Sequence, residues 1–221
     1  GVISGLDFCK LAFKLSGKET LFLQKVKDGA SVKKGKVIAI IKAKNQTILT
    51  AERTALNFLS HSSGISSLTS EFVKKVNNKT KICCTRKTTP NLRLLEKYAV
   101  KKGGGFNHRY NLSDEIMIKD NHIDFAGGIS QAITKTKQYL SDNTLNLKII
   151  VEARSLKEIE EILQNEGVYR ILIDNFSFED TRKAVALINW KCFTESSGGI
   201  NEDTIRKYAE CGVDYISSGA L

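Results

Sequence analysis

Proline, methionine and tryptophan are nearly absent from this chain of 221 residues, since each occurs only once. A single proline and the lack of low-complexity stretches argue against long disordered linkers. No apolar run approaches the roughly 20 residues that a membrane-spanning helix needs. Hydrophobic residues nevertheless make up 41% of the chain, which is ample for a core. The composition therefore indicates a globular protein of one generous domain, or of a domain with a smaller appendage.

The five cysteines have neither an even count nor the spacing of metal ligands. Cys83 and Cys84 are adjacent in an apolar run, so on a strand their side chains would point to opposite faces. This pattern indicates reduced thiols and a cytoplasmic protein rather than a disulfide framework. The chain opens on Gly1 instead of a methionine and shows no signal peptide there, so we expect further residues before it.

Positive charge is abundant, with a formal net charge of +10 at pH 7. Such a charge favours an acidic partner: nucleic acid, a membrane surface or small polyanions. It is densest in residues 85–122, around the glycine run Gly103–Gly105, which lacks the Gly-Lys-Ser spacing of a P-loop. The cations of this segment are Arg86, Lys87, Arg93, Lys97, Lys101, Lys102, His108, Arg109 and Lys119.

The first part of the chain has short apolar runs separated by turn residues. Residues 21–26 and 37–43 are short runs of mostly apolar residues, and Asp28-Gly29 lies between them, which predicts a hairpin in a small antiparallel β unit. Residues 51–76 have helical spacing that Ser62-Ser63-Gly64 interrupts, so we expect two helices or one bent helix there.

Strand-like and helix-like segments alternate in the rest of the chain, which predicts a parallel sheet. We expect an incomplete TIM-like α/β barrel, with a doubly wound sheet as the alternative, because six strands are too few for a full barrel. The domain division that follows is an N-terminal α+β domain over residues 1–50 and a barrel over residues 51–221. The candidate strands are residues 81–85, 115–120, 147–153, 169–175, 191–196 and 213–219, and the helix-like segments are 91–100, 128–140, 155–167, 177–189 and 201–212.

Every candidate strand ends in chemically active residues, and parallel strands share one carboxyl-terminal edge. Arginine offers a bidentate fork to a carboxylate or phosphate, and lysine offers a point charge. Glu152 and Asp174 could hold Mg²⁺ on a phosphorylated ligand, bind sugar hydroxyls or stabilise a developing positive charge, although each could also be a helix cap. The glycine- and serine-rich loops offer backbone N–H groups to an anion. The strand-end residues are Arg86-Lys87, Lys119, Glu152, Asp174, Glu195–Gly199 and Ser218-Gly219.

The most specific feature is a set of sequence blocks in a fixed order: ERTALNFL, SGI, TRKTTP, LRLLEKYAV, GGG, NHR, IKDNHI, VEA, IDN, SSGGI and VDYISSGAL. With these blocks the chain resembles the quinolinate phosphoribosyltransferase family, also called nicotinate-nucleotide pyrophosphorylase (carboxylating), over essentially its whole length. The resemblance implies an incomplete barrel with an open-faced sandwich-like N-terminal domain, assembled at least as a homodimer. It also implies conversion of quinolinate and phosphoribosyl pyrophosphate (PRPP) to nicotinate mononucleotide, pyrophosphate and CO₂ in de novo NAD biosynthesis, with Mg²⁺.

The same resemblance assigns roles to single residues. Lys87, Glu152 and Asp174 are the implied catalytic residues, with Lys87 between quinolinate and the pyrophosphate, and with the two acids beside the PRPP ribose and the metal. Arg53 would reach into a neighbouring subunit's site, and Thr85 belongs to the substrate-binding set. The implied quinolinate-binding cations are Arg86, His108, Arg109 and Lys119, and the implied 5′-phosphate loops contain Ser197, Gly198, Gly199, Ser218 and Gly219.

Two departures from the family and two alternative functions stay open at this point. Family members begin with several dozen further residues and continue beyond Leu221, so we expect this chain to be part of a longer protein. A related pyridine phosphoribosyltransferase that does not decarboxylate is the nearest alternative, although it would need fewer cations for the substrate carboxylates. A nucleic-acid-binding module would instead spread its cations over an outer face with stacking aromatic residues.

Overall fold

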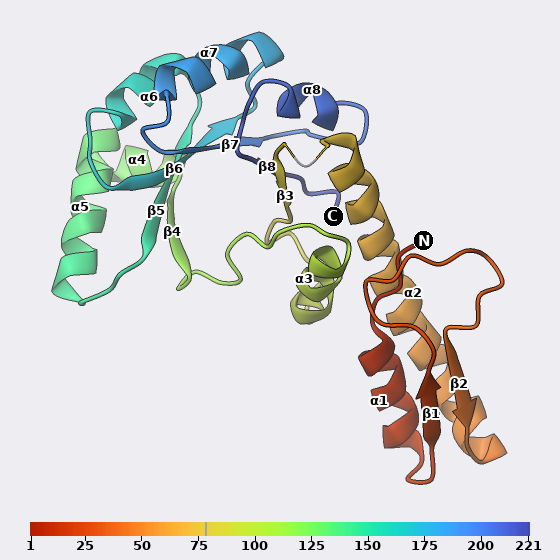
Figure 1. Ribbon diagram of the computed structural model, residues 1–221. Coiled ribbons are helices and arrows are strands. Elements are labelled where there is room, and N and C mark those ends of the chain that lie inside the picture. Colours follow the sequence, from red (N-terminus) through yellow and green to blue (C-terminus); the bar gives the residue numbers. More distant parts are fainter. Residues whose placement is uncertain (78) are drawn as a thin grey trace. The chain divides into compact units, whose positions relative to one another are not determined.

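The computed structural model describes residues 1–77 and 79–221, and these form two compact units (Figure 1). The first unit contains Gly1–Lys74, Lys87–Asn107 and Leu221, and the second contains Lys75–Arg86 and His108–Ala220. The predicted domain boundary between residues 50 and 51 falls within a helix, and the division at that place remains a prediction. Among the residues that the structure describes, no helix is long and apolar enough to cross a membrane.

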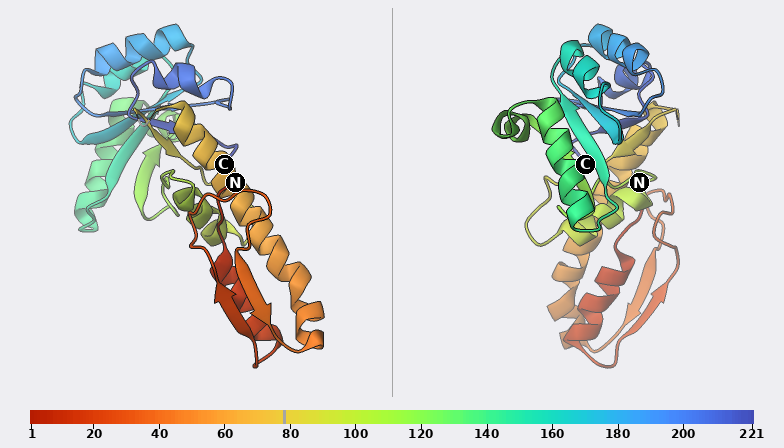
Figure 2. Two further views of the ribbon diagram at one scale, coloured as in Figure 1. Left: turned by 45° about the vertical axis from the view of Figure 1, so that its right-hand side comes forward. Right: turned by 90° about the vertical axis from the view of Figure 1, so that its left-hand side faces the viewer.

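The first unit is a small α+β structure. Its strands β1 (Leu21–Gln24) and β2 (Ala39–Lys42) pair antiparallel, as expected. Helix α1 (Leu6–Ser16) lies beside this pair (Figure 2), with α2 (Asn45–Lys75) and α3 (Arg93–Lys102) as the other helices. The core of the unit joins α1 to α2 and is formed by Leu6, Cys9, Phe13, Ala51, Ala55 and Leu59.

The predicted turn at Asp28-Gly29 is confirmed, because the Ala30 N–H donates to the Lys27 carbonyl oxygen at 3.1 Å, but the turn lies within a long connection between the strands, and Asp28 also serves a helix. Residues 25–38 join β1 to β2, and the Asp28 carboxylate accepts from the backbone N–H groups of Gly5 at 2.9 Å and Leu6 at 3.2 Å. It also accepts from the Tyr98 hydroxyl at 2.7 Å. Asp28 therefore satisfies free N–H groups at the start of α1, a helix that the sequence did not predict.

The predicted interruption at Ser62-Ser63-Gly64 is absent, and α2 is one continuous helix of 31 residues. The serines are used for packing rather than for a break. The Ser62 hydroxyl donates to Ser4 Oγ at 2.8 Å, and the Ser63 hydroxyl accepts from the Ser4 backbone N–H at 3.0 Å. Their small side chains let the N-terminal segment approach the helix closely, so tertiary contacts outweigh the weak helix propensity of serine and glycine.

The second unit is built on a six-stranded parallel sheet in the order β3-β8-β7-β6-β5-β4. All six predicted strands are confirmed, with ends shifted by no more than two residues. From β4 to β8 each strand lies beside the next in sequence, and β3 lies outside β8, so the order never reverses as it would in a doubly wound sheet. The strands are β3 (Lys81–Cys83), β4 (Glu115–Ile118), β5 (Lys148–Ala153), β6 (Val168–Asp174), β7 (Phe193–Ser197) and β8 (Tyr215–Ser217).

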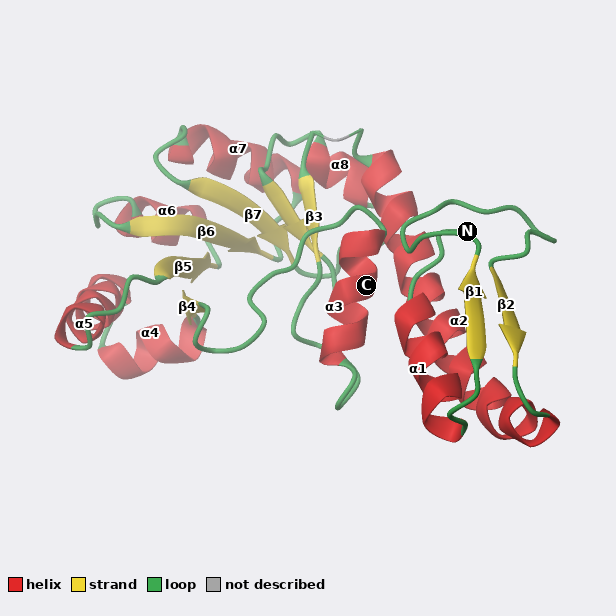
Figure 3. Cartoon of the chain, turned by 60° about the horizontal axis from the view of Figure 1, so that its bottom comes forward, coloured by secondary structure: helices red, strands yellow, loops and turns green. Residues whose placement is uncertain are grey.

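The helices that follow the strands cover the outer side of this sheet (Figure 3). Successive helices from α4 to α8 contact one another, as in the outer ring of a barrel. The apolar side chains between sheet and helices, such as Ile150, Ile171 and Ile188, are fully buried. The unit is therefore an incomplete α/β barrel, as predicted, and α4 is a helix that the sequence did not predict. The helices are α4 (Asp120–Ala126), α5 (Ile129–Asp142), α6 (Leu156–Ile162), α7 (Phe178–Ile188) and α8 (Ile205–Ala209).

Candidate functional site

The carboxyl-terminal edge of the barrel sheet gathers most of the predicted site residues. Lys119 directly follows β4, Glu152 is the second-last residue of β5, and Asp174 ends β6. Asp174 is paired in register with Ser197, the last residue of β7, and Ser218 follows β8. Since all strands are parallel, these side chains lie at one edge of the second unit.

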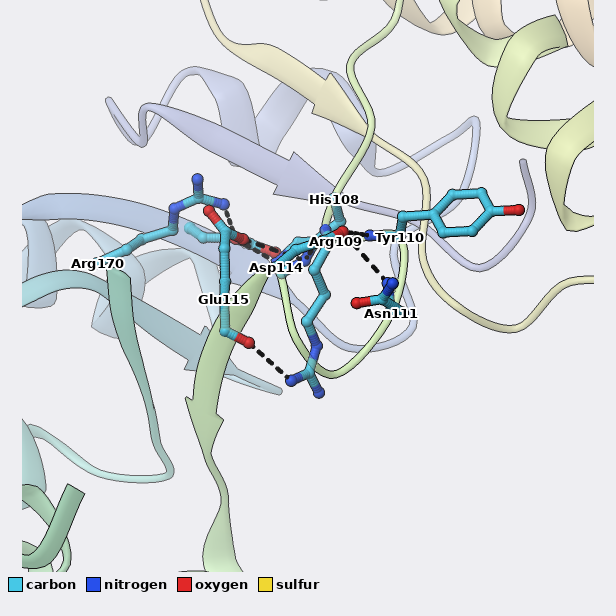
Figure 4. Close-up of polar contacts among 8 residues, drawn as sticks. His108, Arg109, Tyr110, Asn111, Asp114, Glu115 and Arg170 are labelled. Carbon is cyan, nitrogen blue, oxygen red and sulfur yellow. Dashed lines mark hydrogen bonds and ion pairs between the residues drawn. The ribbon is translucent and has the colours of Figure 1, made fainter. Parts of the chain in front are cut away.

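The loop before β4 brings His108 and Arg109 to the sheet (Figure 4). The Asp114 carboxylate accepts from the backbone N–H groups of Tyr110 at 2.6 Å and Asn111 at 3.3 Å, which folds the loop back on itself. Arg109 Nη1 donates to the carbonyl oxygen of Glu115, the first residue of β4, at 3.2 Å. The Arg109 guanidinium is therefore held at the sheet by a turn and a strand rather than by a free loop.

Two guanidinium groups, those of Arg86 and Arg109, repel each other in this unit. Burial lowers the pKa of Arg109, and the charge of Arg86 lowers it further, while the nearby acids Glu115 and Asp114 oppose this. Arg86 Nε is buried and has no hydrogen-bond acceptor among the residues described. Like charges with an unused buried donor are costly without an anion, so this place favours an anionic ligand.

The second unit also contains a buried ionic network formed by Glu195, Arg170 and His108. Glu195 on β7 is fully buried, and its Oε2 accepts from Arg170 Nη1 at 2.6 Å. His108 Nε2 lies 3.3 Å from the same oxygen. Burial works to raise the pKa of Glu195, but its contact with His108 and the charge of Arg170 outweigh it and leave that pKa below its usual range. The sequence places Glu195 at a strand end, yet only strand pairing shows that it shares a face with Arg170.

A second ionic group is formed by Lys119 and Glu152, with Asp174 and Asp120 as further acids whose charges act on Glu152. Lys119 Nζ lies 3.2 Å from Glu152 Oε2, and the Glu152 side chain is mostly buried. Burial raises the pKa of Glu152, Lys119 lowers it, and the negative charges of Asp174 and Asp120 raise it again. The net shift is upward, so Lys119 does not fully offset the burial and the neighbouring acids. The acids of this group therefore have negative charge left over, and they can bind a further cation.

These acids suit a metal ion that arrives with its ligand. Within residues 1–77 and 79–221, no group of three or more His, Cys, Asp or Glu side chains could by itself hold a metal ion. Mg²⁺ is usually held by one or two carboxylates together with substrate phosphates. Glu152 and Asp174 fit that donor set, with the phosphates left to the substrate.

The loops after β7 and β8 are tied to each other. The Ser218 hydroxyl donates to the Ile200 carbonyl oxygen at 2.8 Å, so this side chain joins the two loops. Gly198 has a φ of +94°, and a Cβ there would collide with Asn175. Gly199 also has positive φ, with open space where a side chain would point. Only glycine fits at position 198, and the backbone of this loop is open to a ligand.

Three predicted residues remain, namely Thr85, Arg53 and Lys87. Thr85, which is half-buried, follows β3 in the second unit. Arg53 on α2 and Lys87 are exposed and belong to the first unit.

In the first unit, the segment after Lys87 is anchored by two helices. The Thr89 backbone N–H donates to Glu96 Oε2 at 3.1 Å, and His61 Nε2 lies 3.0 Å from Glu96 Oε1. Glu96, on α3, is buried, whereas His61 on α2 is partly exposed. The partner of His61 could not be read from the sequence, because Glu96 lies far from it along the chain.

Comparison with known proteins identifies the family. Residues 1–63 match the quinolinate phosphoribosyl transferase N-terminal domain, and residues 65–221 match the C-terminal domain of the same family. Quinolinate phosphoribosyltransferase [decarboxylating] 1b of Nicotiana tabacum is 38% identical over 235 aligned residues, which cover 100% of this chain and 67% of the relative. A probable nicotinate-nucleotide pyrophosphorylase [carboxylating] of Methanocaldococcus jannaschii is 46% identical over 186 residues, covering 80% of this chain and 64% of the relative.

Solved structures give the same result. The crystal structure of NadC from Streptococcus pyogenes superposes with a TM-score of 0.93 at 42% identity, covering 100% of this chain and 77% of that one. The nicotinate-nucleotide pyrophosphorylase of Francisella tularensis gives a TM-score of 0.94 at 40% identity, covering 99% and 77%. Two family matches that together span almost the whole chain leave one conclusion: the chain belongs to the quinolinate phosphoribosyltransferase family.

Proposed function

We propose that this chain transfers the phosphoribosyl group of PRPP to the ring nitrogen of quinolinate and releases the 2-carboxylate as CO₂. The products are nicotinate mononucleotide and pyrophosphate, as in de novo NAD biosynthesis. The observation that carries the proposal is the pair Arg86 and Arg109, two mutually repelling guanidinium groups with an unused buried donor, in a chain of this family. Quinolinate is a dianion and would satisfy both groups.

The cations bind the pyridine dicarboxylate in this proposal. Arg86 and Arg109 grip its carboxylates, and Lys119 approaches from the end of β4. Arg53 completes the set from a neighbouring subunit of a homodimer. His108 is also in the proposed substrate-binding set, with its ring directed at protein partners rather than at solvent.

The acids and loops bind PRPP in this proposal. The loops with Ser197, Gly198, Gly199 and Ser218-Gly219 would surround the 5′-phosphate with backbone N–H groups. Glu152 and Asp174 would hold the ribose and a Mg²⁺ ion bound to the pyrophosphate, and that ion would neutralise negative charge on the leaving group. Lys87 would contact the pyrophosphate, and Thr85 would line the same substrate pocket.

The chemistry needs both kinds of charge. Loss of pyrophosphate leaves positive charge on the sugar, which Glu152 and Asp174 can stabilise. The cations place the ring nitrogen beside the anomeric carbon, so attack becomes effectively unimolecular. Once ribosylated, the ring nitrogen is positively charged and stabilises the electron pair that departing CO₂ leaves on C2, and C2 then takes up a proton from solvent. The proposed location of the enzyme is the cytoplasm.

The test is a reaction of the purified protein with quinolinate, PRPP and Mg²⁺, followed by assays for pyrophosphate and CO₂. Equal yields of both products support the proposal. Pyrophosphate with nicotinate but not with quinolinate would identify the protein as a non-decarboxylating pyridine phosphoribosyltransferase instead. A matched control is Glu202→Gln, which changes only an exposed ion pair with Lys75 and should leave activity unchanged.

A further inference from the structure

We propose that Glu195, held by Arg170, is a positioning residue that fixes the His108 imidazole and, through it, aims the Arg109 guanidinium at quinolinate. The inference deepens the proposed function and rests on it for the identity of the ligand. The new element is the role of Glu195 and Arg170, two buried residues outside the proposed substrate-binding set.

The first step concerns which ring nitrogen of His108 carries the proton. The Arg109 backbone N–H donates to His108 Nδ1 at 2.9 Å, so Nδ1 acts as an acceptor. A neutral imidazole with an accepting Nδ1 carries its proton on Nε2. That nitrogen lies 3.3 Å from Glu195 Oε2, whereas Glu115 Oε2 lies 4.0 Å from Nδ1 and is too far for a hydrogen bond. The hydrogen bond from the Arg109 N–H to Nδ1 therefore selects the Nε2–H form of His108, with Nε2 at ion-pair distance from Glu195.

The second step is the fixed position of Glu195. Its side chain is completely buried, Arg170 Nη1 lies 2.6 Å from Oε2, and the Arg170 guanidinium is stacked 3.8 Å from the Tyr215 ring centre. Glu195 and Tyr215 are paired in register on adjacent strands, so neighbouring side chains of the sheet hold the carboxylate. Such a buried pair is weak evidence for stability, because packed apolar residues often stabilise as much. A role in positioning His108 explains why a charged pair occupies this place, which stability alone does not explain.

The third step connects this network to the substrate. The His108–Arg109 hydrogen bond fixes the peptide from which the Arg109 side chain leaves, and Arg109 Nη1 is fixed again at the Glu115 carbonyl oxygen at 3.2 Å. If the imidazole turns, the first of these two anchors is lost. A shift of about 1 Å in a substrate-positioning group costs on the order of 100-fold in rate.

Glu195→Gln is the direct test, because it keeps the shape and removes the charge. Calorimetric quinolinate affinity should fall about 10- to 100-fold. PRPP affinity should change by less than about threefold, as expected of a substitution away from its contacts. The loss of quinolinate affinity should be much smaller in a His108→Asn background, because both substitutions break the same contact. Glu202→Gln is the control for an acid-to-amide change. Unchanged quinolinate affinity, or an equal loss for both substrates, would overturn the proposal.

A measurement on the unmodified protein covers the case in which Glu195→Gln does not fold. Nitrogen-15 NMR of the histidine rings should show His108 protonated on Nε2 and not on Nδ1. A proton on Nδ1 would overturn the proposal whatever the substrate. Failure of the proposed function would give a different result. The protein would then not turn over quinolinate, although NMR would still show His108 in the expected tautomer.

Discussion

Replacing Arg170 with methionine removes the cationic partner of a carboxylate that has no exposed surface. The Arg170–Glu195 contact is 2.6 Å, with the side chains 7% and 0% exposed. Breaking a buried pair on one side typically costs about 3–5 kcal/mol, because the remaining charge is left uncompensated. For a chain of this size, 1 kcal/mol corresponds to about 2–4 °C in melting temperature, so Arg170→Met should melt about 6–20 °C lower.

The stability loss of Arg170→Met should depend on pH, and the pKa of Glu195 determines in which direction. The pKa of Glu195 is held below its ordinary value in the folded protein, so its stabilising contribution is present above the unfolded value of about 4.3. The contribution is lost as pH falls through the lower, folded pKa. In Arg170→Met the carboxyl can take up a proton instead, so the deficit relative to the unmodified protein should shrink as the solution becomes more acidic.

Thermal unfolding at neutral and acidic pH, followed by circular dichroism, measures both effects. The double variant Arg170→Met/Glu195→Leu is the control, since it removes both charges and should recover much of the lost stability. A melting temperature of Arg170→Met within about 2 °C of the unmodified protein would refute the reasoning, because it corresponds to less than about 1 kcal/mol. A deficit that grows at acidic pH would refute the assigned charge of Glu195.

Three further predictions concern the ligand site. Arg86→Ala and Lys119→Ala should each weaken calorimetric quinolinate binding by about 10-fold or more, with melting temperatures nearly unchanged, because each removes a charge-assisted contact to a carboxylate; unaltered affinity would remove that residue from the pocket. Gly198→Ala should raise the KM for PRPP, since its Cβ would collide with Asn175 at a φ of +94°, and an unaffected KM would show that this loop does not bind the phosphate. Burial raises the pKa of Glu152, so kcat should fall as pH drops through that raised pKa, and Glu152→Gln should lose this limb of the pH profile; a profile identical in both proteins would exclude Glu152 as the titrating group.

The barrel could be predicted from the sequence because its signals are local. Strands such as residues 148–153 are continuous apolar runs that end in a charged or small residue, and the helices between them have clear periodicity. Parallel strands then place their ends at one edge without further information. Lys119, Glu152 and Asp174 could be grouped in this way from the order of the residues alone.

The features that could not be predicted depend on distant partners. The Asp28-Gly29 turn has a local signal, but its sequence does not show that the Asp28 carboxylate accepts from the N–H groups of Gly5 and Leu6. The Ser62-Ser63-Gly64 run would weaken an isolated helix, whereas here Ser4 packs against its two serines. Glu195 has an ordinary strand-end position in the sequence, and only the register of β6 and β7 brings Arg170 to the same face.

The most direct measurement follows quinolinate labelled with carbon-14 in its 2-carboxylate, incubated with the protein, PRPP and Mg²⁺. We expect labelled CO₂ in a one-to-one ratio with pyrophosphate, and loss of both products in Arg86→Ala at low quinolinate. Formation of pyrophosphate without labelled CO₂ would contradict the proposed reaction. Formation of pyrophosphate with nicotinate as substrate, but not with quinolinate, would contradict it as well.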